Sequence, residues 1–186
     1  MIQHYSENEI IAALGKKDRK VFHYLFESYF RQLVLFGEYF LLDRTEAEDI
    51  VQEVFLGLWN RAETSPITHL KSYLFTQVRN RCLNRIKHLN VAEKHNEWIR
   101  EAFEYAEMPE IEMDENRIKH VYQAIEQLPP RARTIFTLCV VEGKTYKEVA
   151  KELGISVNTV NMQMKRAYKF LRTRLGILLF FFINSL

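Results

Sequence analysis

The stretch Lys151–Leu171, KELGISVNTVNMQMKRAYKFL, has the pattern of the second half of a helix-turn-helix. Gly154 can supply the turn, and Ser156 is a residue type that favours the N-terminal cap of a helix. At about 100° per residue, the helix after Ser156 has an apolar side that we expect to pack inward. This side consists of Val160, Met164, Ala167 and Leu171.

The opposite side of the same helix is polar and basic. We predict that it contacts DNA in the major groove, because amides can bond to base edges while lysine and arginine bind phosphates. The alternative is a basic helix that faces only solvent. The residues predicted to contact DNA are Asn158, Thr159, Asn161, Met162, Lys165, Arg166 and Lys169.

The residues before Lys151 complete the motif. Pro129 and Pro130 end one helix and begin the next, since proline cannot continue a helix but fits its first turn. The mostly apolar helix that follows is predicted to stop at Gly143. Thr145 and Glu148 then form the pattern of a capping box, which predicts a helix from about residue 146 to 153.

Charge and composition divide the chain into a front, an acidic middle and a basic back. Residues Glu93–Glu115 contain nine acidic and two basic residues, whereas the segment from Pro129 to the end contains ten basic and three acidic ones. The chain has only six glycines and four prolines and no Asn-Gly or Asp-Gly hairpin signal, so we predict an all-α fold. The predicted organisation is a helical domain at 1–92, an acidic linker at 93–115 and a helix-turn-helix domain at 116–186.

In the front domain, LLDRTEAEDIVQEVFLGLWNR predicts a helix that runs to about Asn60 and begins at a capping box of Thr45 and Glu48. Its predicted core side is Ile50, Val51, Val54, Phe55, Leu58 and Trp59. The opposite side has one leucine among acidic and amide residues, which suits protein docking better than DNA. An ordinary solvent-exposed face is the alternative. The predicted docking residues are Asp49, Gln52, Glu53 and Leu56.

A second front-domain helix, LKSYLFTQVRNRCLNRIKHL, also has two sides. Its apolar side is Leu74, Phe75, Val78, Cys82, Ile86 and Leu89. The other side mixes aromatic, amide and basic groups, which suit single-stranded nucleic acid, where bases stack or bond while cations follow the backbone. A surface helix of an unrelated bundle is the alternative. The residues predicted to contact nucleic acid are Tyr73, Gln77, Asn80, Arg81, Asn84 and Lys87.

No cofactor or metal site is expected. Cys82 and Cys139 lie far apart in apolar segments, and the six histidines lack ligand spacing, so buried thiols in a reducing cytoplasm are predicted. The N-terminus shows no export signal. The tail has seven consecutive apolar residues, Ile177 to Ile183, far fewer than the roughly 20 that cross a bilayer. We expect it to pack on either domain, with a surface that binds a partner protein as the sharper hypothesis.

The segments AEDIVQEVFLGLW, SYLFTQVRNRCLNRIK and LPPRARTIFTLCVVEGKTYKEVAKELGISVNTVNMQMKRA together resemble bacterial RNA polymerase sigma factors of the extracytoplasmic-function group. The resemblance covers about Phe22 to Arg174 and extends to members from the Bacteroidetes. It implies that the front domain is region 2, which docks on the beta-prime clamp helices of core RNA polymerase and opens and reads the minus-ten element. The back domain is then region 4, which reads the minus-thirty-five element of promoter DNA and binds the beta flap.

The resemblance gives each predicted surface a role. Asp49, Gln52, Glu53 and Leu56 become the docking face. The six nucleic-acid residues from Tyr73 to Lys87 become the minus-ten face, and residues 63–69 match a loop that captures an unstacked base. The seven DNA residues from Asn158 to Lys169 become the minus-thirty-five face. The acidic linker resembles the segment that threads towards the RNA channel, and the usual regulator is an anti-sigma factor, membrane-bound in the Bacteroidetes.

Departures from the family pattern bear on promoter choice. Many members have a basic residue where this chain has Asn161 and Gln163, and an aspartate is frequent at Asn84. We therefore expect amide contacts and DNA shape to contribute more to recognition here.

Two other classes of function are alternatives. An autonomous helix-turn-helix regulator that binds an operator is the main alternative, but it needs neither the strand-binding helix nor the acidic linker. A nucleic-acid-processing enzyme is disfavoured because the acids lie at caps, on a solvent face or in the linker, without a metal-binding cluster. We expect a promoter-specificity subunit that is not itself an enzyme.

Overall fold

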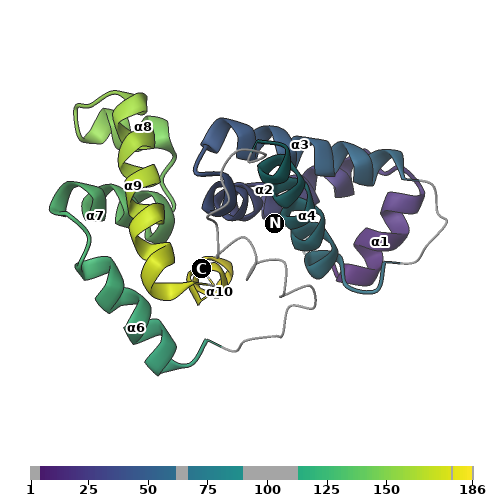
Figure 1. Cartoon of the computed structure of the whole chain (residues 1–186). Coiled ribbons are helices and arrows are strands. Elements are labelled where there is room, and N and C mark those ends of the chain that lie inside the picture. The colour runs from purple at the N-terminus through teal and green to yellow at the C-terminus, as the bar shows by residue number, and fades with distance from the viewer. Residues whose placement is uncertain (1–4, 62–66, 90–112, 177, 186) are drawn as a thin grey trace. The chain divides into compact units, whose positions relative to one another are not determined.

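The computed structural model describes residues 5–61, 67–89, 113–176 and 178–185, and every regular element in this part of the chain is helical (Figure 1). This agrees with the predicted all-α class. The chain divides into two compact units, Met1–Leu41 with Thr45–His88, and Leu89–Leu186 with Leu42–Arg44. The predicted linker lies mostly outside the described residues. Its last two residues form the start of a helix, because Asp114 is the N-cap and Glu115 the first residue of α6.

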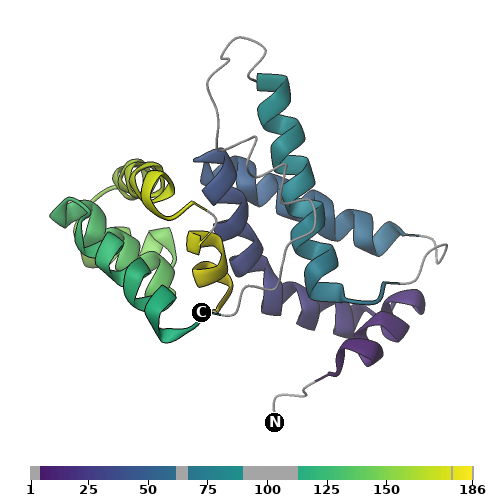
Figure 2. The same cartoon turned by 60° about the horizontal axis from the view of Figure 1, so that its bottom comes forward.

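The N-terminal unit is a bundle in which α4 crosses α3, as Figure 2 shows. Its core contains Leu25, Leu33, Phe36, Val51, Phe55, Leu74 and Val78. Gly37 allows a close approach, since a Cβ there would lie 3.1 Å from Ala47 Cβ and 3.7 Å from Cys82 Sγ. The helices are α1 (Glu7–Gly15), α2 (Arg19–Leu41), α3 (Arg44–Asn60) and α4 (Leu70–Leu89).

The predicted start of α3 is wrong by one or two residues. The helix begins at Arg44, so Thr45 lies inside its first turn and is not the N-cap. Asp43 directly precedes the helix and is also a preferred cap residue. Asp43 and Glu46 are three residues apart, which is the same capping-box spacing as that of Thr45 and Glu48. Two overlapping cap patterns therefore competed at this end.

The C-terminal unit packs α7 and α8 against the long helix α9. The predicted inward side of α9 is confirmed, since Val160, Met164, Ala167 and Leu171 are all buried. Phe136 and Tyr168 meet edge to face with centroids 5.7 Å apart. The elements are α6 (Glu115–Glu126), α7 (Pro130–Phe136), the π-helix η1 (Thr137–Val141), α8 (Tyr146–Glu152), α9 (Val157–Leu175) and α10 (Leu178–Ser185).

The apolar tail forms α10 and contacts α6 and α9. Leu179, Phe182 and Ile183 are buried, and the Phe182 ring lies edge to face against Tyr122 at 5.5 Å. This confirms packing on the C-terminal unit as the role of these three side chains. Among the described residues, none of the helices combines the length and apolar character needed to span a bilayer.

Candidate polymerase and nucleic-acid interfaces

The predicted docking face lies at the surface of α3. Asp49, Gln52, Glu53 and Leu56 are all exposed, and Leu56 keeps 60% of its surface accessible. Behind them, Ile50, Val51, Val54, Phe55 and Leu58 are buried as predicted. Trp59 is only half-buried, so it lies at the edge of the core rather than within it. A large exposed leucine among polar residues is what a protein contact needs at its centre.

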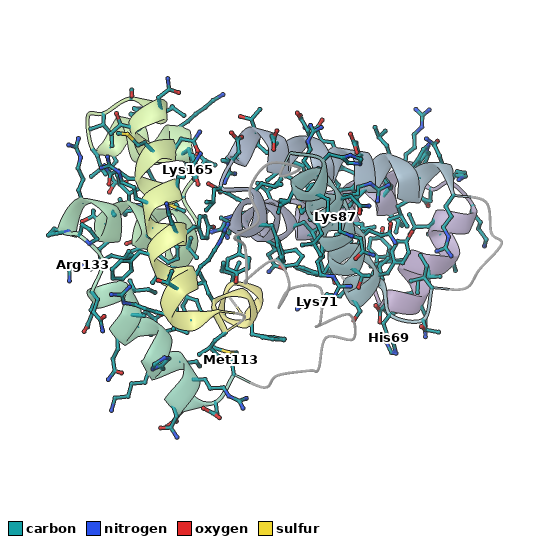
Figure 3. All side chains as sticks on the ribbon, viewed as in Figure 1. His69, Lys71, Lys87, Met113, Arg133 and Lys165 are labelled. Carbon is teal, nitrogen blue, oxygen red and sulfur yellow. The ribbon has the colours of Figure 1, made fainter. Side chains whose placement is uncertain are left out.

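The predicted minus-ten face is also accessible, but to differing degrees. Asn80, Asn84 and Lys87 are exposed. Tyr73, Gln77 and Arg81 are half-buried because neighbouring side chains cover them. Figure 3 labels Lys71 near the start of α4 and Lys87 near its end. The opposite side of the helix is buried as predicted, except for Leu89, whose side chain lies outside the described residues.

Arg81 connects α4 to α3 in the N-terminal unit. Its Nη1 donates to Gln77 Oε1 at 3.0 Å, and its Nε lies 3.9 Å from Glu53 Oε2 on α3. One member of the minus-ten face is thereby held next to one member of the docking face. The hydrogen bond to Gln77 orients the Arg81 guanidinium, and the Glu53 carboxylate attracts it from the side of α3.

Arg79 is a residue that sequence analysis missed. It is 6% exposed, and its Nε and Nη2 both donate to Asn80 Oδ1 at 3.3 Å. Burial lowers the pKa of Arg79, although a guanidinium stays charged at physiological pH. The contact orients the Asn80 amide, so its NH2 group is directed away from Arg79. Sequence alone gave no signal for this, because a buried arginine is rare.

A cation from the residue directly after α3 lies over an aromatic ring at the start of α4. The Arg61 guanidinium lies 5.2 Å from the centroid of Tyr73. Arginine commonly lies over aromatic rings in this way, and aromatic rings are also the groups on which bases stack. The predicted base-capturing loop, residues 63–69, is described only from residue 67 onward, so that prediction lies largely outside the described residues.

The predicted minus-thirty-five face begins at the cap of α9. The Ser156 side chain accepts the Thr159 N–H at 3.0 Å, which confirms the predicted N-cap. Thr159 is half-buried, with its Oγ1 2.9 Å from Ser156 Oγ, so its hydroxyl belongs to the cap. The exposed members of the face are Asn158, Met162, Lys165, Arg166 and Lys169, with Asn161 half-buried.

Gln163 does not belong to this face. Its side chain is 7% exposed and turns inward beside Met164 on α9. The buried Gln163 side chain is not available for direct contact with DNA in this structure, and the expected change in promoter preference stays a prediction. Asn161 remains the position where the departure from the family pattern can act at the surface.

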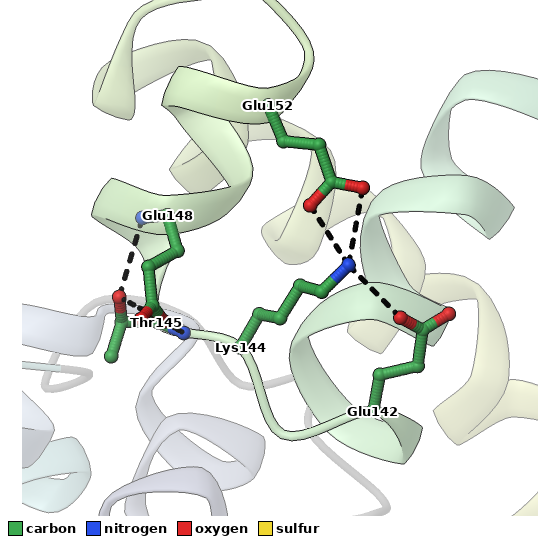
Figure 4. Close-up of polar contacts among 5 residues, drawn as sticks. All are labelled: Glu142, Lys144, Thr145, Glu148 and Glu152. Atoms are coloured by element: carbon green, nitrogen blue, oxygen red, sulfur yellow. Dashed lines mark hydrogen bonds and ion pairs between the residues drawn. The ribbon is translucent and has the colours of Figure 1, made fainter.

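The turn before α8 is held by the two sets of contacts drawn in Figure 4. Thr145 Oγ1 accepts the Glu148 N–H at 3.3 Å while Glu148 Oε2 accepts the Thr145 N–H at 2.7 Å, so the predicted capping box is confirmed. The Thr145 N–H and, to a smaller extent, the Thr145 hydroxyl donate to the Glu148 carboxylate and lower its pKa. The φ values of Gly143 and Gly154, 80° and 62°, confirm the two predicted glycine turns.

Lys144 supplies the second set. Its Nζ lies 2.8 Å from Glu152 Oε2 and 3.1 Å from Glu142 Oε2, which joins the end of α8 to the residue after η1. The carboxylates of Glu152 and Glu142 raise the pKa of Lys144. These contacts connect the turn before α8 to the end of that helix, which packs on α9.

The comparison with protein families agrees with this arrangement. Residues 25–90 match the family model described as Sigma-70 region 2, and residues 119–171 match the one described as Sigma-70, region 4. Together the matched residues make up more than half of the chain. The two domains expected from the resemblance are therefore both present, in the expected order.

Curated relatives extend along most of the chain. RNA polymerase sigma-H factor of Pseudomonas aeruginosa is 25% identical over 178 residues, with 90% of this chain and 92% of the relative covered. RNA polymerase sigma factor CarQ of Myxococcus xanthus is 28% identical, covering 70% of this chain and 75% of the relative. The ECF RNA polymerase sigma factor SigX of Bacillus subtilis is 22% identical, covering 86% of each.

A solved structure of CnrH in complex with the cytosolic domain of CnrY aligns with 88% of this chain and 93% of that chain, at 19% identity. Its TM-score of 0.37 is too low to support an inference. The resemblance to Bacteroidetes members stays a prediction. The region 2 and region 4 matches and the curated relatives agree, and the chain belongs to the extracytoplasmic-function group of bacterial sigma-70 factors.

Proposed function

We propose that this sigma factor works as a promoter-specificity subunit without catalytic activity, through three faces on α3, α4 and α9. One observation carries the proposal. On each of these helices the side chains predicted to bind a partner are exposed or half-buried, whereas the opposite side is buried in the core.

The docking face is proposed to bind the clamp helices of the polymerase beta-prime subunit. Leu56 offers apolar area at the centre of the contact, and Asp49 and Glu53 supply negative charge at its rim. Interfaces commonly place an apolar anchor inside such a polar rim. Region 4 is proposed to bind the beta flap, as the resemblance implies.

The minus-ten face is proposed to hold one separated promoter strand. Extruding a base costs a few kcal/mol, which a protein surface can offset by stacking and hydrogen bonds. Tyr73 provides a ring, Asn80 and Asn84 provide amides, and Lys87 provides a cation for phosphate.

The minus-thirty-five face is proposed to enter the major groove of duplex DNA. Asn158 and Asn161 lie near the N-terminal end of α9, where a recognition helix reads base edges. Lys165, Arg166 and Lys169 follow along the helix and suit phosphate contacts.

Regulation and location follow from the family resemblance. We propose that the factor acts in the cytoplasm and is held inactive by an anti-sigma factor, which is membrane-bound in the Bacteroidetes pattern. The buried residues of α10 argue against the tail as the docking surface of that partner, since Leu179, Phe182 and Ile183 already pack within the C-terminal unit.

Run-off transcription from a pool of promoter-like fragments tests this function. Purified protein is combined with bacterial core RNA polymerase, and the transcribed fragments are sequenced. We expect transcripts from a restricted set that shares two elements, one upstream and one near the start site. Binding to duplex DNA without any association with polymerase would instead indicate an autonomous operator-binding regulator.

A further inference from the structure

We infer that Glu7 and Lys17 are positioning residues for minus-ten recognition. Glu7 binds the first turn of α4 and Lys17 binds the end of α3, and these two helix ends flank Tyr73. The inference rests on the proposed function of α4. Neither residue belongs to any of the three faces defined above.

Glu7 binds the beginning of α4 from a position 63 residues earlier in the chain. Its Oε1 accepts the Leu70 N–H, and lies 3.4 Å from the Lys71 nitrogen. The first N–H groups of a helix have no partner within the helix, and a negative charge at this end is favoured. Figure 2 shows α1, in purple, beside the start of α4. Glu7 thus acts as a cap supplied by a different helix.

Lys17 binds the other helix end. Its Nζ donates to the carbonyl oxygen of Trp59 and to that of Arg61 at 3.2 Å, and lies 5.8 Å from the centroid of the Trp59 ring. Cations suit the C-terminal carbonyls of a helix. Arg61 in turn lies over Tyr73. The contacts therefore run from Lys17 through Arg61 to a ring of the minus-ten face.

The backbone of Lys17 supports this role independently. Its φ is 56°, a conformation that is uncommon for residues other than glycine. Glycine would adopt it without a steric penalty, and the chain already has a glycine two residues earlier, at Gly15. A lysine in this position is accounted for by its side chain, which reaches the carbonyls of α3 from the turn between α1 and α2.

These contacts have a specific consequence. The docking face lies in the middle of α3 and is supported by its own buried side, so it does not depend on Glu7 or Lys17. The position of Tyr73 does depend on them, through the first turn of α4 and through Arg61. Removing either side chain is therefore expected to weaken strand binding while leaving polymerase binding intact.

The test uses full-length variants assembled with core RNA polymerase. The variants are Glu7→Ala, Glu7→Gln and Lys17→Gly. The matched controls are Glu115→Ala, an exposed acid in the first turn of α6, and Lys16→Ala, an exposed neighbour of Lys17. The probe is a fluorescent single strand carrying the minus-ten segment of a promoter recovered by run-off transcription. Polymerase affinity and the thermal midpoint are measured in parallel.

We expect Glu7→Ala and Lys17→Gly each to lower strand affinity about tenfold, as for the loss of a charged hydrogen bond, with polymerase affinity unchanged. Glu7→Gln keeps an acceptor without charge and should lose less. Lys17→Gly is the decisive variant, because glycine adopts a positive φ without steric strain. This variant should keep the thermal midpoint and still weaken strand binding.

Unchanged strand affinity in both Glu7→Ala and Lys17→Gly would overturn the inference. So would an equal loss of polymerase affinity, or a lowered thermal midpoint in Lys17→Gly, since either result would indicate a purely structural role. If the unaltered holoenzyme bound polymerase but not the strand, the proposed role of α4 would itself be wrong, and the inference would fall with it.

Discussion

Arg81 Nε on α4 lies 3.9 Å from Glu53 Oε2 on α3, so a residue of the minus-ten face touches a residue of the docking face. The two side chains are 35% and 67% exposed, and ion pairs at such positions contribute little to stability. The pair is better explained as a means of orienting Arg81, which also donates to Gln77.

Arg81→Ala is expected to affect function more than folding. Loss of the exposed pair should change the free energy of unfolding by less than about 0.5 kcal/mol, whereas strand affinity of the holoenzyme should fall about tenfold. Arg85→Ala is the matched control, because Arg85 pairs similarly with Glu46 at 3.8 Å but is outside the predicted face. Equal effects of both variants on strand binding would remove any specific role for Arg81.

Leu56→Glu should weaken binding to core RNA polymerase by about 30-fold, which corresponds to the loss of a central interface residue. The fold should be retained, because the side chain is 60% exposed and no core contact depends on it. Fluorescence titration against core polymerase measures the effect, with Lys119→Glu on α6 as the control. Full affinity in Leu56→Glu would exclude this part of α3 from docking.

The double variant Lys165→Ala with Arg166→Ala should weaken binding to the minus-thirty-five duplex and reduce its salt dependence. Each phosphate contact contributes about 0.9 to the slope of log affinity against log salt, so the slope should fall by about 1.8. Lys119→Ala, also exposed but on α6, should leave the slope unchanged. An unaltered slope in the double variant would mean that another surface meets the phosphates.

Phe182→Ala should destabilise the C-terminal unit by about 3 kcal/mol, because the ring is 2% exposed and packs against Tyr122. Urea denaturation followed by circular dichroism measures the change. Leu153→Ala, at a 37% exposed side chain, should cost much less. If Phe182→Ala left stability unchanged, the buried position of α10 would be contradicted and a partner-binding role for the tail would regain support.

The contacts of Lys144 predict a pH dependence. Glu152 and Glu142 raise its pKa in the folded state, so their stabilisation is fully present below the ordinary lysine pKa of about 10.4 and is lost as pH rises through the folded value. The thermal midpoints of the unaltered protein and of Lys144→Met should therefore differ at pH 8 and converge towards pH 11. A constant difference across this range would show that Lys144 stabilises the turn without its charge.

Local patterns predicted the helix-turn-helix well because its signals are themselves local. The capping box of Thr145 and Glu148, the cap at Ser156 and the turn at Gly154 each depend on residues within a few positions. The start of α3 was placed wrongly because two cap patterns overlap there. The change from α7 to a π-helix at Thr137 had no sequence signal that we can identify.

Contacts between distant segments could not be predicted from the sequence. Glu7 and Leu70 are 63 residues apart, and neither belongs to a motif that would connect them. Gln163 is a polar residue that follows the exposed Met162, yet its side chain is buried, like that of its other neighbour Met164. Arg79 was assigned no role, because only the packed bundle shows that this side chain is buried.

Strand opening tests the central claim most directly. A promoter recovered by run-off transcription is treated with permanganate, which modifies unpaired thymines, in the presence of the sigma factor, core RNA polymerase or both. We predict modification within the minus-ten element only when both proteins are present, and its loss with Leu56→Glu. Duplex binding by the sigma factor alone, with no strand opening when polymerase is added, would contradict the claim.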